Sequence, residues 1–329
     1  MSGTVVVLVN GEVLANGRGS RIADQRTNAR ELTEGLLPLL RSNQNVVIMH
    51  GNKPQVGFVL FRSELASHVL HTIPLDVCGA DTQGATGYML SQAIMNSLST
   101  EHIGRRVMCV ITQTLVDNSL PPDGIQVRAI GPWFDRDKAD QYRQTRGWTM
   151  IEEPGRGYRR AVPAYPAKEI LEIKGIQRLV EEGVIVIAGG GGGIPVVLNE
   201  NSEFDGIEAV IETEQLACLM AQQLHADVFV SVIESDNKFI LSGLSTENRS
   251  RLSVEELDDI LSRETFRSKS VQGILAAASK FLHAGGKQVV ITTLRKLTDT
   301  LHKQSGLWIG PLEPFVSLFQ DFEKPGGTE

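Results

Sequence analysis

VIVIAGGGGGIPVV, at residues 184–197, sets five consecutive glycines between a short apolar run and a proline. Each glycine loses more conformational freedom on folding than any other residue, so such a run is costly unless the backbone must approach something closely. The preceding run, VIVIA, lacks the alternation of a half-exposed strand and is typical of a strand buried on both faces of a parallel sheet. The stretch therefore predicts a buried strand that ends in a loop, and a ligand is one candidate for the close approach.

Similar apolar runs recur along the chain, and helical patterns lie between them. The other runs are TVVVLV (4–9), NVVIMH (45–50), VMCVIT (107–112), DVFVSVI (227–233) and QVVITT (288–293). Residues 26–42 carry Leu32, Leu36, Leu39 and Leu40 on one helical face, although Pro38 is expected to kink or end that helix early; residues 87–99 repeat the pattern with Met89, Leu90, Ile94 and Leu98. Strands alternating with helices predict right-handed crossovers and an α/β fold with a doubly wound sheet.

Residues 118–166 break this rhythm because they are dense in proline, glycine, aromatic and charged residues. They predict a lid or subdomain, with one short helix beginning near Asp135 and a hairpin-like stretch after it. Further on, Ser253 and Glu256 form a capping-box pattern that predicts the start of a helix. The tail beyond Pro311 is expected to fray, or to dock through Phe315, Leu318 and Phe319.

Composition excludes several classes of protein. Of 329 residues, 41% are hydrophobic and 22% charged, as in ordinary soluble globular proteins, and the net charge of -7 leaves no basic footprint for nucleic acid. No signal-peptide pattern and no apolar stretch long enough to span a bilayer is present, so we expect a cytoplasmic protein without a membrane partner. Cys78, Cys109 and Cys218 lie in apolar segments, which predicts buried thiols in a reducing compartment.

Three glycine-containing stretches are candidate ligand loops, because ligands of open α/β sheets bind at the carboxyl ends of the strands. They are HGNKPQVG (50–57), GADTQGATGY (79–88) and the five-glycine run. The last two could present backbone amides to an anion such as phosphate, or could be simple turns. None is a Walker A motif or a dinucleotide fingerprint.

Several side chains near these stretches leave alternatives open. His50 is a possible acid or base, but hydrogen bonding that stabilises the turn is the simpler interpretation. Lys53 is either a phosphate contact or an exposed side chain. Arg128, Arg159 and Arg160 are solvated charges by default, although a planar guanidinium is suited to clamping a carboxylate or phosphate.

Five motifs in this order resemble carbamate kinase, a member of the amino-acid kinase superfamily. They are HGNKPQVG, PLDVCGADTQGATGYML, AIGPWF, GYRRAVPAYP and AGGGGGIPVV, and the resemblance covers about residues 4–310. It implies a three-layer αβα sandwich with an eight-stranded, mainly parallel sheet, in one domain over 1–310. A carbamoyl phosphate half (about 1–200, with a protruding subdomain at about 118–166) would precede a nucleotide half (about 201–310), with a tail at 311–329.

The resemblance also implies an activity and partners. Carbamate kinases transfer phosphate reversibly between ATP and carbamate with Mg²⁺, and they form homodimers. Catalytic roles would fall to Arg128, in place of a family lysine, and Lys53. The implied substrate-binding residues are Asn10, Gly11, His50, Gly51, Asn52, Gln83, Gly84, Gly190, Gly191 and Gly192. The implied residues for ATP or ADP are Gly189, Glu212, Thr213, Glu234, Asp236, Lys269 and Gly273, and no residue is assigned as a metal ligand.

The chain departs from the family pattern at several of these positions. Val9, Asn10 and Gly11 stand where the family has Gly-Gly-Asn, so Asn10 would substitute after a shift of one residue. Family lysines are replaced by Thr213 and by Gly273, four residues after Lys269. The Thr-Asp-Val-Asp sequence near adenosine is matched only in part by residues 233–236, which include Glu234 and Asp236.

Two hypotheses follow from these departures. One is an active carbamate kinase, or a relative acting on a similar carbamoyl or carboxyl substrate. The other is a pseudo-kinase that binds a small anion and serves as a regulatory subunit beside an enzyme of carbamoyl metabolism. Loss of one preorganised cation typically costs about a hundredfold in rate, so Mg²⁺, Lys53, Lys174 or Lys269 would have to compensate in an active enzyme.

Overall fold

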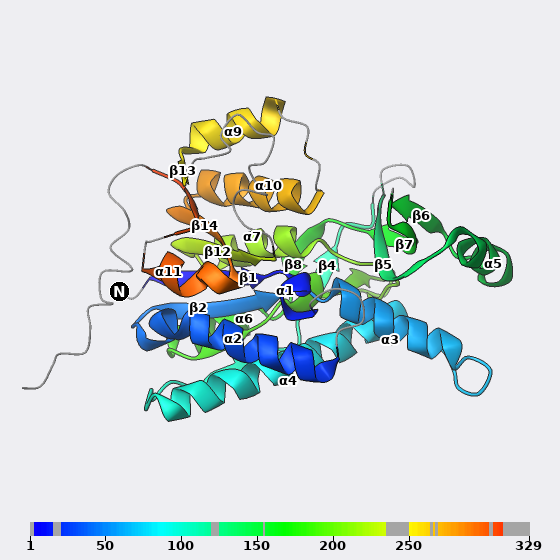
Figure 1. Ribbon diagram of the computed structural model, residues 1–329, viewed down its shortest axis with the longest axis horizontal. Coiled ribbons are helices and arrows are strands. Elements are labelled where there is room, and N and C mark those ends of the chain that lie inside the picture. The colour runs from blue at the N-terminus through cyan, green and yellow to red at the C-terminus, as the bar shows by residue number, and fades with distance from the viewer. Residues whose placement is uncertain are drawn as a thin grey trace, which may run out of the picture.

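The apolar runs of the sequence form five inner strands and one edge strand of an eight-stranded sheet (Figure 1). In this computed structural model the described residues are 3–15, 21–119, 125–153, 155–234, 250–263, 266, 269–302 and 305–311. The strand order is β13 (Arg251–Leu252), β15 (Leu307–Ile309), β14 (Gln288–Thr293), β12 (Val228–Ile233), β1 (Thr4–Val9), β2 (Asn45–His50), β9 (Ile185–Ile187) and β3 (Val107–Cys109). Neighbours are parallel except β14 and β15, so the mainly parallel sheet is confirmed.

Helices cover both faces of this sheet, which confirms the three-layer α/β sandwich (Figure 1). On one face lie α6 (Ile173–Glu181), α7 (Thr213–Gln223), α9 (Val254–Arg263) and α10 (Lys269–His283). On the other lie α2 (Ile22–Arg41), α4 (Leu75–Thr100) and α11 (Leu297–Leu301). In β1, Val6 and Leu8 pack toward the first set while Val5, Val7 and Val9 pack toward the second. Burial on both faces is why the strand is continuously apolar.

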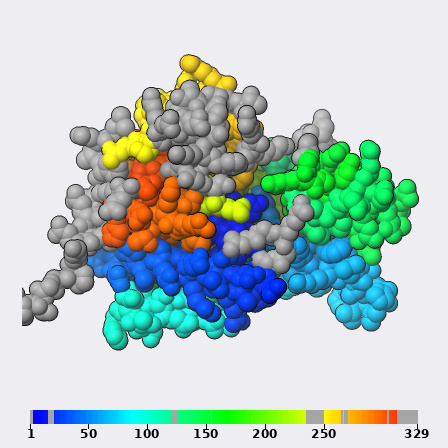
Figure 2. Space-filling view, viewed as in Figure 1, coloured from blue at the N-terminus to red at the C-terminus, as the bar shows by residue number. Residues whose placement is uncertain are grey.

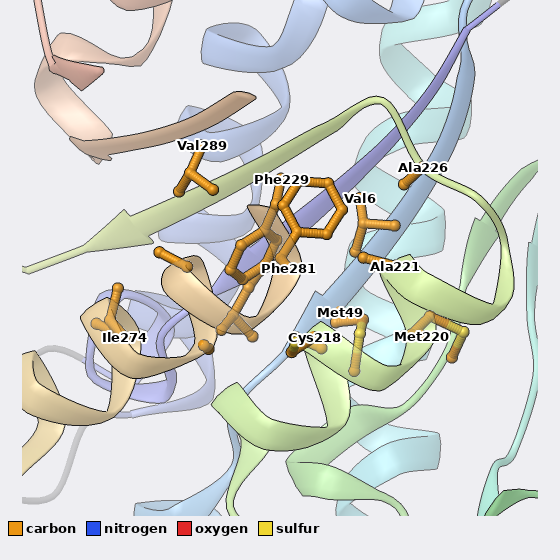
Figure 3. Close-up of a cluster of buried hydrophobic side chains, with 14 of the residues drawn as sticks. Val6, Met49, Cys218, Met220, Ala221, Ala226, Phe229, Ile274, Phe281 and Val289 are labelled. Carbon is orange, nitrogen blue, oxygen red and sulfur yellow. The ribbon is translucent and has the colours of Figure 1, made fainter. Parts of the chain in front are cut away.

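The core under α7 and α10 is built around two phenylalanines (Figure 3). Phe229 on β12 and Phe281 on α10 are fully buried, and their ring centroids lie 6.0 Å apart. Val6, Met220 and Val289 complete the contact between sheet and helices. Each fully buried side chain of this size contributes about 1.5–3 kcal/mol to folding, so the core fixes the helices that begin at the strand ends.

Residues 118–166 contain a protruding subdomain with its own sheet (Figure 1). Its strands are β5 (Gln126–Phe134), β7 (Gly157–Ala164) and β6 (Met150–Glu153), with α5 (Arg136–Arg146) between β5 and β6. The helix near Asp135 and the hairpin after it are both confirmed, because the Asp135 carboxylate accepts from the Lys138 amide at 2.8 Å and β6 pairs antiparallel with β7. The subdomain lies against α3 (Lys53–Leu65), as Figure 2 also shows.

The remaining elements join the subdomain to the body or line the carboxyl edge of the main sheet. A four-stranded sheet has the order β11 (Phe204–Gly206), β10 (Ile194–Leu198), β4 (Gln113–Val116) and β8 (Ala167–Ile170). The short helical elements are α1 (Gly11–Ala15), η2 (Gly190–Gly192) and η3 (Leu294–Lys296). The capping box is confirmed as well, since the Glu256 amide donates to Ser253 Oγ and the Ser253 amide donates to the Glu256 carboxylate.

Four local expectations were wrong. Pro38 does not end α2 early, because it lies in the last turn and the helix continues to Arg41. Residues 79–88 form no loop but lie inside α4, whose buried face outweighs the cost of its glycines. The run at 107–112 forms a strand only over Val107–Cys109. Cys109 is exposed on β3, whereas Cys78 and Cys218 are buried.

The expected docking of the tail and one candidate nucleotide residue cannot be compared with the structure. The tail residues Phe315, Leu318 and Phe319 and the candidate Asp236 lie outside the described residues. Within the described ranges, every helix is too short or too polar to cross a membrane.

Candidate functional site

The candidate site begins where β1 and β2 end side by side. The Gly51 amide donates to the Val9 carbonyl at 2.8 Å, and a Cβ on Gly51 would lie 2.5 Å from the Gly11 nitrogen. Two glycines therefore let the turn after β1 pack directly on the turn after β2. Asn10 caps the short α1, because its Oδ1 accepts from the Glu12 amide at 3.0 Å.

The five-glycine run packs closely against side chains from β2 and the turn after it. A Cβ on Gly190 would lie 2.6 Å from His50 Nε2, and a Cβ on Gly191, whose φ is +67°, would overlap Asn52 Oδ1. The backbone of the run therefore closely approaches other parts of the protein, as well as any ligand. The same packing places the run beside the turn that carries Asn52 and Lys53.

Three amides of the run donate hydrogen bonds inside the protein, and two donate none among the described residues. The Gly189 amide donates to Thr112 Oγ1 at 2.8 Å, and the Gly192 and Gly193 amides donate to carbonyls inside the run. Among the described residues, the amides of Gly190 and Gly191 have no such acceptor. Neighbouring free amides of this kind favour an anion.

Gln83 and Asn52 act as positioning residues. Gln83 exchanges two hydrogen bonds with the Thr112 backbone, at 3.0 and 2.9 Å, and Thr112 in turn holds the Gly189 amide. Asn52 Nδ2 donates to Thr82 Oγ1 at 2.7 Å. Gly84, predicted to bind substrate, instead lies inside α4, where its amide belongs to the helix. The glycines of α4 form no loop, and the assignment of Gly84 to the substrate stays a prediction.

His50 is fully buried at the end of β2. Burial lowers its pKa to about 4, against a smaller opposing effect of the hydrogen bond with the Gly51 carbonyl. The ring is consequently neutral at physiological pH and supplies no positive charge to an anion. Its contacts with Gly51 and Gly190 favour the turn-stabilising role.

One carboxylate, Glu212, joins the two catalytic candidates. Lys53 Nζ, at the start of α3, lies 2.8 Å from Glu212 Oε2, and Arg128 Nε, on β5 of the subdomain, donates to Glu212 Oε1. Arg128 also donates to Gln126 Oε1 at 2.7 Å. Glu212 is 16% exposed, so these charges interact in a partly water-excluded place with a net charge of one positive unit.

The first turn of α7, directly after Glu212, contains unpaired buried polar atoms. Thr213 and Glu214 are 4% and 7% exposed, and Thr213 Oγ1 and Glu214 Oε2 have no hydrogen-bond partner among the described residues. Each unsatisfied buried group costs about 1–3 kcal/mol. A helix N-terminus with an orphaned hydroxyl is suited to an anion.

A second group of charges lies where β1 and β12 end. Glu234, just after β12, hydrogen-bonds to Glu12; partial burial and this acidic neighbour raise the Glu234 pKa, while Arg156 opposes the rise. Arg156 and Arg159 stack on Trp133 of the subdomain, with Cζ atoms 5.6 and 5.1 Å from the ring centroid. Glu12 was missed from the sequence, although an acidic residue just after a strand end is a usable signal.

The remaining nucleotide-side candidates are only partly placed. Asn10 Nδ2 lies 3.5 Å from Ser270 Oγ, which brings the turn after β1 to the first turn of α10. Lys269 is the first residue of α10. Gly273 lies in the same helix, and a Cβ added there would meet open space.

Comparisons with known proteins identify the family of this fold. The amino acid kinase family matches residues 3–293. A carbamate kinase of Pyrococcus horikoshii is 35% identical over 312 residues, covering 93% of this chain and 99% of the relative. The solved structure of carbamate kinase from Giardia lamblia bound to citric acid has a TM-score of 0.85 and 28% identity, covering 94% of this chain and 98% of its own. The Giardia lamblia enzyme bound to AMP-PNP has a TM-score of 0.81 and 30% identity, with the same coverage.

The chain therefore belongs to the amino acid kinase family. Within that family it is a divergent relative of the carbamate kinases, in agreement with the five motifs of the sequence.

Proposed function

We propose that the chain is a carbamate kinase-like phosphotransferase that converts ATP and carbamate reversibly to ADP and carbamoyl phosphate, or acts on a closely similar carbamoyl or carboxyl substrate. The observation that carries this proposal is the bridge of Lys53 and Arg128 on Glu212, beside the glycine run. The names of the similar proteins, and AMP-PNP in one of them, support a nucleotide and carbamate as substrates.

The residues around Glu212 have the properties that phosphoryl transfer needs. The reaction gives the protein little covalent work, so catalysis depends on positioning and on neutralising charge. Lys53 and Arg128 would hold the transferring phosphoryl group or the carbamoyl anion, and Glu212 keeps both cations in place before the substrate arrives. The amides of Gly190 and Gly191 would donate to the same anion.

The site also fits the nucleotide and Mg²⁺ that the family implies. Thr213 Oγ1 is a buried donor without a partner among the described residues, as a phosphate contact would require. Glu12 and Glu234 would hold Mg²⁺, which usually takes one or two carboxylates, water and substrate phosphates. Bound there, Mg²⁺ would neutralise phosphate charge. Gly189, Asp236, Lys269 and Gly273 stay predictions for the nucleotide.

Among the lysine side chains that the structure describes, Lys53 is the best-placed substitute for the family lysine replaced by Thr213. Its Nζ contacts Glu212, the residue immediately before Thr213, so its positive charge lies beside the position where the family carries one. Lys174 is exposed on α6 and makes no comparable contact among the described residues. We therefore assign the compensating charge to Lys53.

Carbamoyl phosphate, ADP and Mg²⁺ test this function directly. Purified protein should form ATP, detected by coupled reduction of NADP⁺, and Arg128→Gln should abolish most of that activity. An exposed subdomain arginine gives a matched control, because Arg136→Gln at the start of α5 should leave the rate unchanged. If the protein binds carbamoyl phosphate in calorimetry but neither binds ADP nor forms ATP, the proposal is wrong and the binding-only subunit is correct.

The binding-only hypothesis has no support from the relatives, and nothing described here indicates a partner enzyme of carbamoyl metabolism.

We further propose that the protein is a cytoplasmic homodimer, formed at an open edge of the sheet. β3 is one edge strand of the sheet, and Met108 on it is 46% exposed. On α4, which contacts β3, Tyr88 and Met95 are 53% and 51% exposed at positions seven apart. Met108→Lys should convert the dimer to a monomer in light scattering.

A further inference from the structure

A polar cavity of about 440 Å³ lies between the subdomain and the C-terminal end of α3. Glu64 of α3, Arg146 at the end of α5, Arg160 of β7 and Glu208 before α7 all line it. The subdomain lies against α3, as Figure 2 shows. The volume is within the range of about 300–1,000 Å³ that is usual for small-molecule sites.

Glu64 organises two arginines in this cavity much as Glu212 organises the catalytic candidates. Arg146 Nη1 lies 2.5 Å from Glu64 Oε2, and Arg160 Nη1 lies 3.2 Å from Glu64 Oε1. Trp148 fixes the guanidinium groups from another side, with its ring centroid 4.7 Å from Arg160 Cζ and 6.0 Å from Arg146 Cζ. Glu64 is only 16% exposed, so the cluster is held in a partly buried position.

The two arginines have donors to spare. A guanidinium carries five N–H groups, yet within the described part of the chain each of these arginines has one hydrogen-bond acceptor, Glu64. Two cations around one carboxylate also leave one positive charge uncompensated. Planar donors with surplus positive charge match a ligand carboxylate.

Glu208 gives the cavity a charge of the opposite sign. It is exposed, and none of the described residues forms an ion pair with it. The lining therefore combines a surplus cation at Arg146 and Arg160 with an anion at Glu208. A purely anionic ligand would meet Glu208, whereas a ligand that carries both charges would satisfy both walls.

We propose that this cavity binds a free α-amino acid, with its carboxylate on Arg146 and Arg160 and its ammonium group on Glu208. The Glu64 cluster is distinct from the site at Glu212, because Glu64 lies eleven positions after Lys53 on α3, about 16 Å along the helix, although the cavity extends to Val162, the cross-strand partner of Arg128. The proposal does not rest on the kinase activity.

Calorimetry on the full chain, without nucleotide or carbamoyl phosphate, tests the proposal with each of the twenty standard amino acids. At least one should bind at millimolar concentration or tighter, and its carboxamide should bind at least about tenfold more weakly. Arg146→Gln should weaken binding by a similar factor. Glu208→Gln should weaken binding of the amino acid but not binding of the analogue that lacks the amino group. The control variant Arg136→Gln should leave the affinity for both ligands unchanged.

The proposal is overturned if no amino acid binds, or if binding survives both Arg146→Gln and Glu208→Gln. It is equally overturned if inorganic phosphate binds more tightly than every amino acid and Arg146→Gln abolishes that binding. Thermal unfolding of each variant shows whether it has folded. Because Glu208 is exposed, Glu208→Gln does not disturb the Glu64 cluster. Because no kinase substrate is present, these outcomes are independent of ATP formation.

Discussion

Replacement of Lys53 by methionine removes the charge that we assign as the substitute for the missing family lysine, while keeping most of the side-chain volume. Lys53 and Arg128 together outweigh Glu212 by one positive charge, so Lys53→Met leaves the group neutral. A unit charge at about 4 Å with an effective dielectric of about 20 is worth about 4 kcal/mol. Loss of one preorganised donor typically costs about 2.7–4 kcal/mol.

The structure favours the lower end of that range. The Lys53 side chain is 36% exposed, so solvent screens part of its effect. We therefore expect kcat/KM for ATP formation from carbamoyl phosphate and ADP to fall about a hundredfold. Lys287→Met is the matched control, because Lys287 also pairs with a carboxylate, Asp227 at 2.5 Å, but at the opposite end of the strands. Its kcat/KM should equal that of the wild type.

Adding Thr213→Lys to Lys53→Met separates charge from position. The added lysine restores a cation directly beside Glu212, and at least about tenfold of the lost rate should return. A change of less than about threefold in Lys53→Met, with folding intact, would refute the assignment of Lys53. A large loss that Thr213→Lys does not rescue would show that Lys53 holds the loop rather than the substrate.

Three further substitutions test other features of the site. Gly191→Ala should lower the free energy of unfolding by at least about 1–2 kcal/mol in urea titration, because φ is +67° and the new Cβ would overlap Asn52. Its control is Gly175→Ala on α6, where the new Cβ would meet open space and should not destabilise the protein. Because the pKa of His50 is lowered to about 4 in the folded state, the unfolded state takes up the proton first as the pH falls. The wild type should therefore lose about 2 kcal/mol more stability than His50→Gln between pH 7 and 5, with no difference above pH 7. Thr213→Val removes a buried hydroxyl that has no partner among the described residues, so the free energy of unfolding should not fall. ADP binding should weaken about tenfold in calorimetry, and an unchanged affinity would exclude Thr213 from the phosphate site.

Most of the fold was accessible from the sequence, because the signals that define it are local. Continuous apolar runs marked five inner strands and the edge strand β3, and the caps at Asp135 and Ser253 marked two helix starts. The same local logic failed in α4, where glycines suggested a loop. There the packing of Leu90, Ile94 and neighbouring residues against the sheet outweighs the low helix propensity of glycine.

The site was only partly accessible, because its contacts join distant parts of the chain. The motifs identified Lys53, Arg128 and Glu212 individually, but these residues meet across 159 and 84 positions of sequence. Nothing local indicates that one carboxylate holds both cations. Glu12 was missed for a related reason: its partner Glu234 belongs to the other half of the chain, and only the pairing of β1 with β12 brings the two together.

That pairing limits how the molecule can move. β1 is hydrogen-bonded to β2 on one side and to β12 on the other, so a single strand is shared by the two halves of the chain. Opening one half away from the other would shear a continuous ladder of backbone hydrogen bonds instead of flexing a linker. Motion at the site is therefore left to the subdomain, which is held to the body by the Arg128–Glu212 contact and by the contacts of Arg146 and Arg160 with Glu64. An incoming anion that draws Arg128 from Glu212 would release one of these contacts in the act of binding.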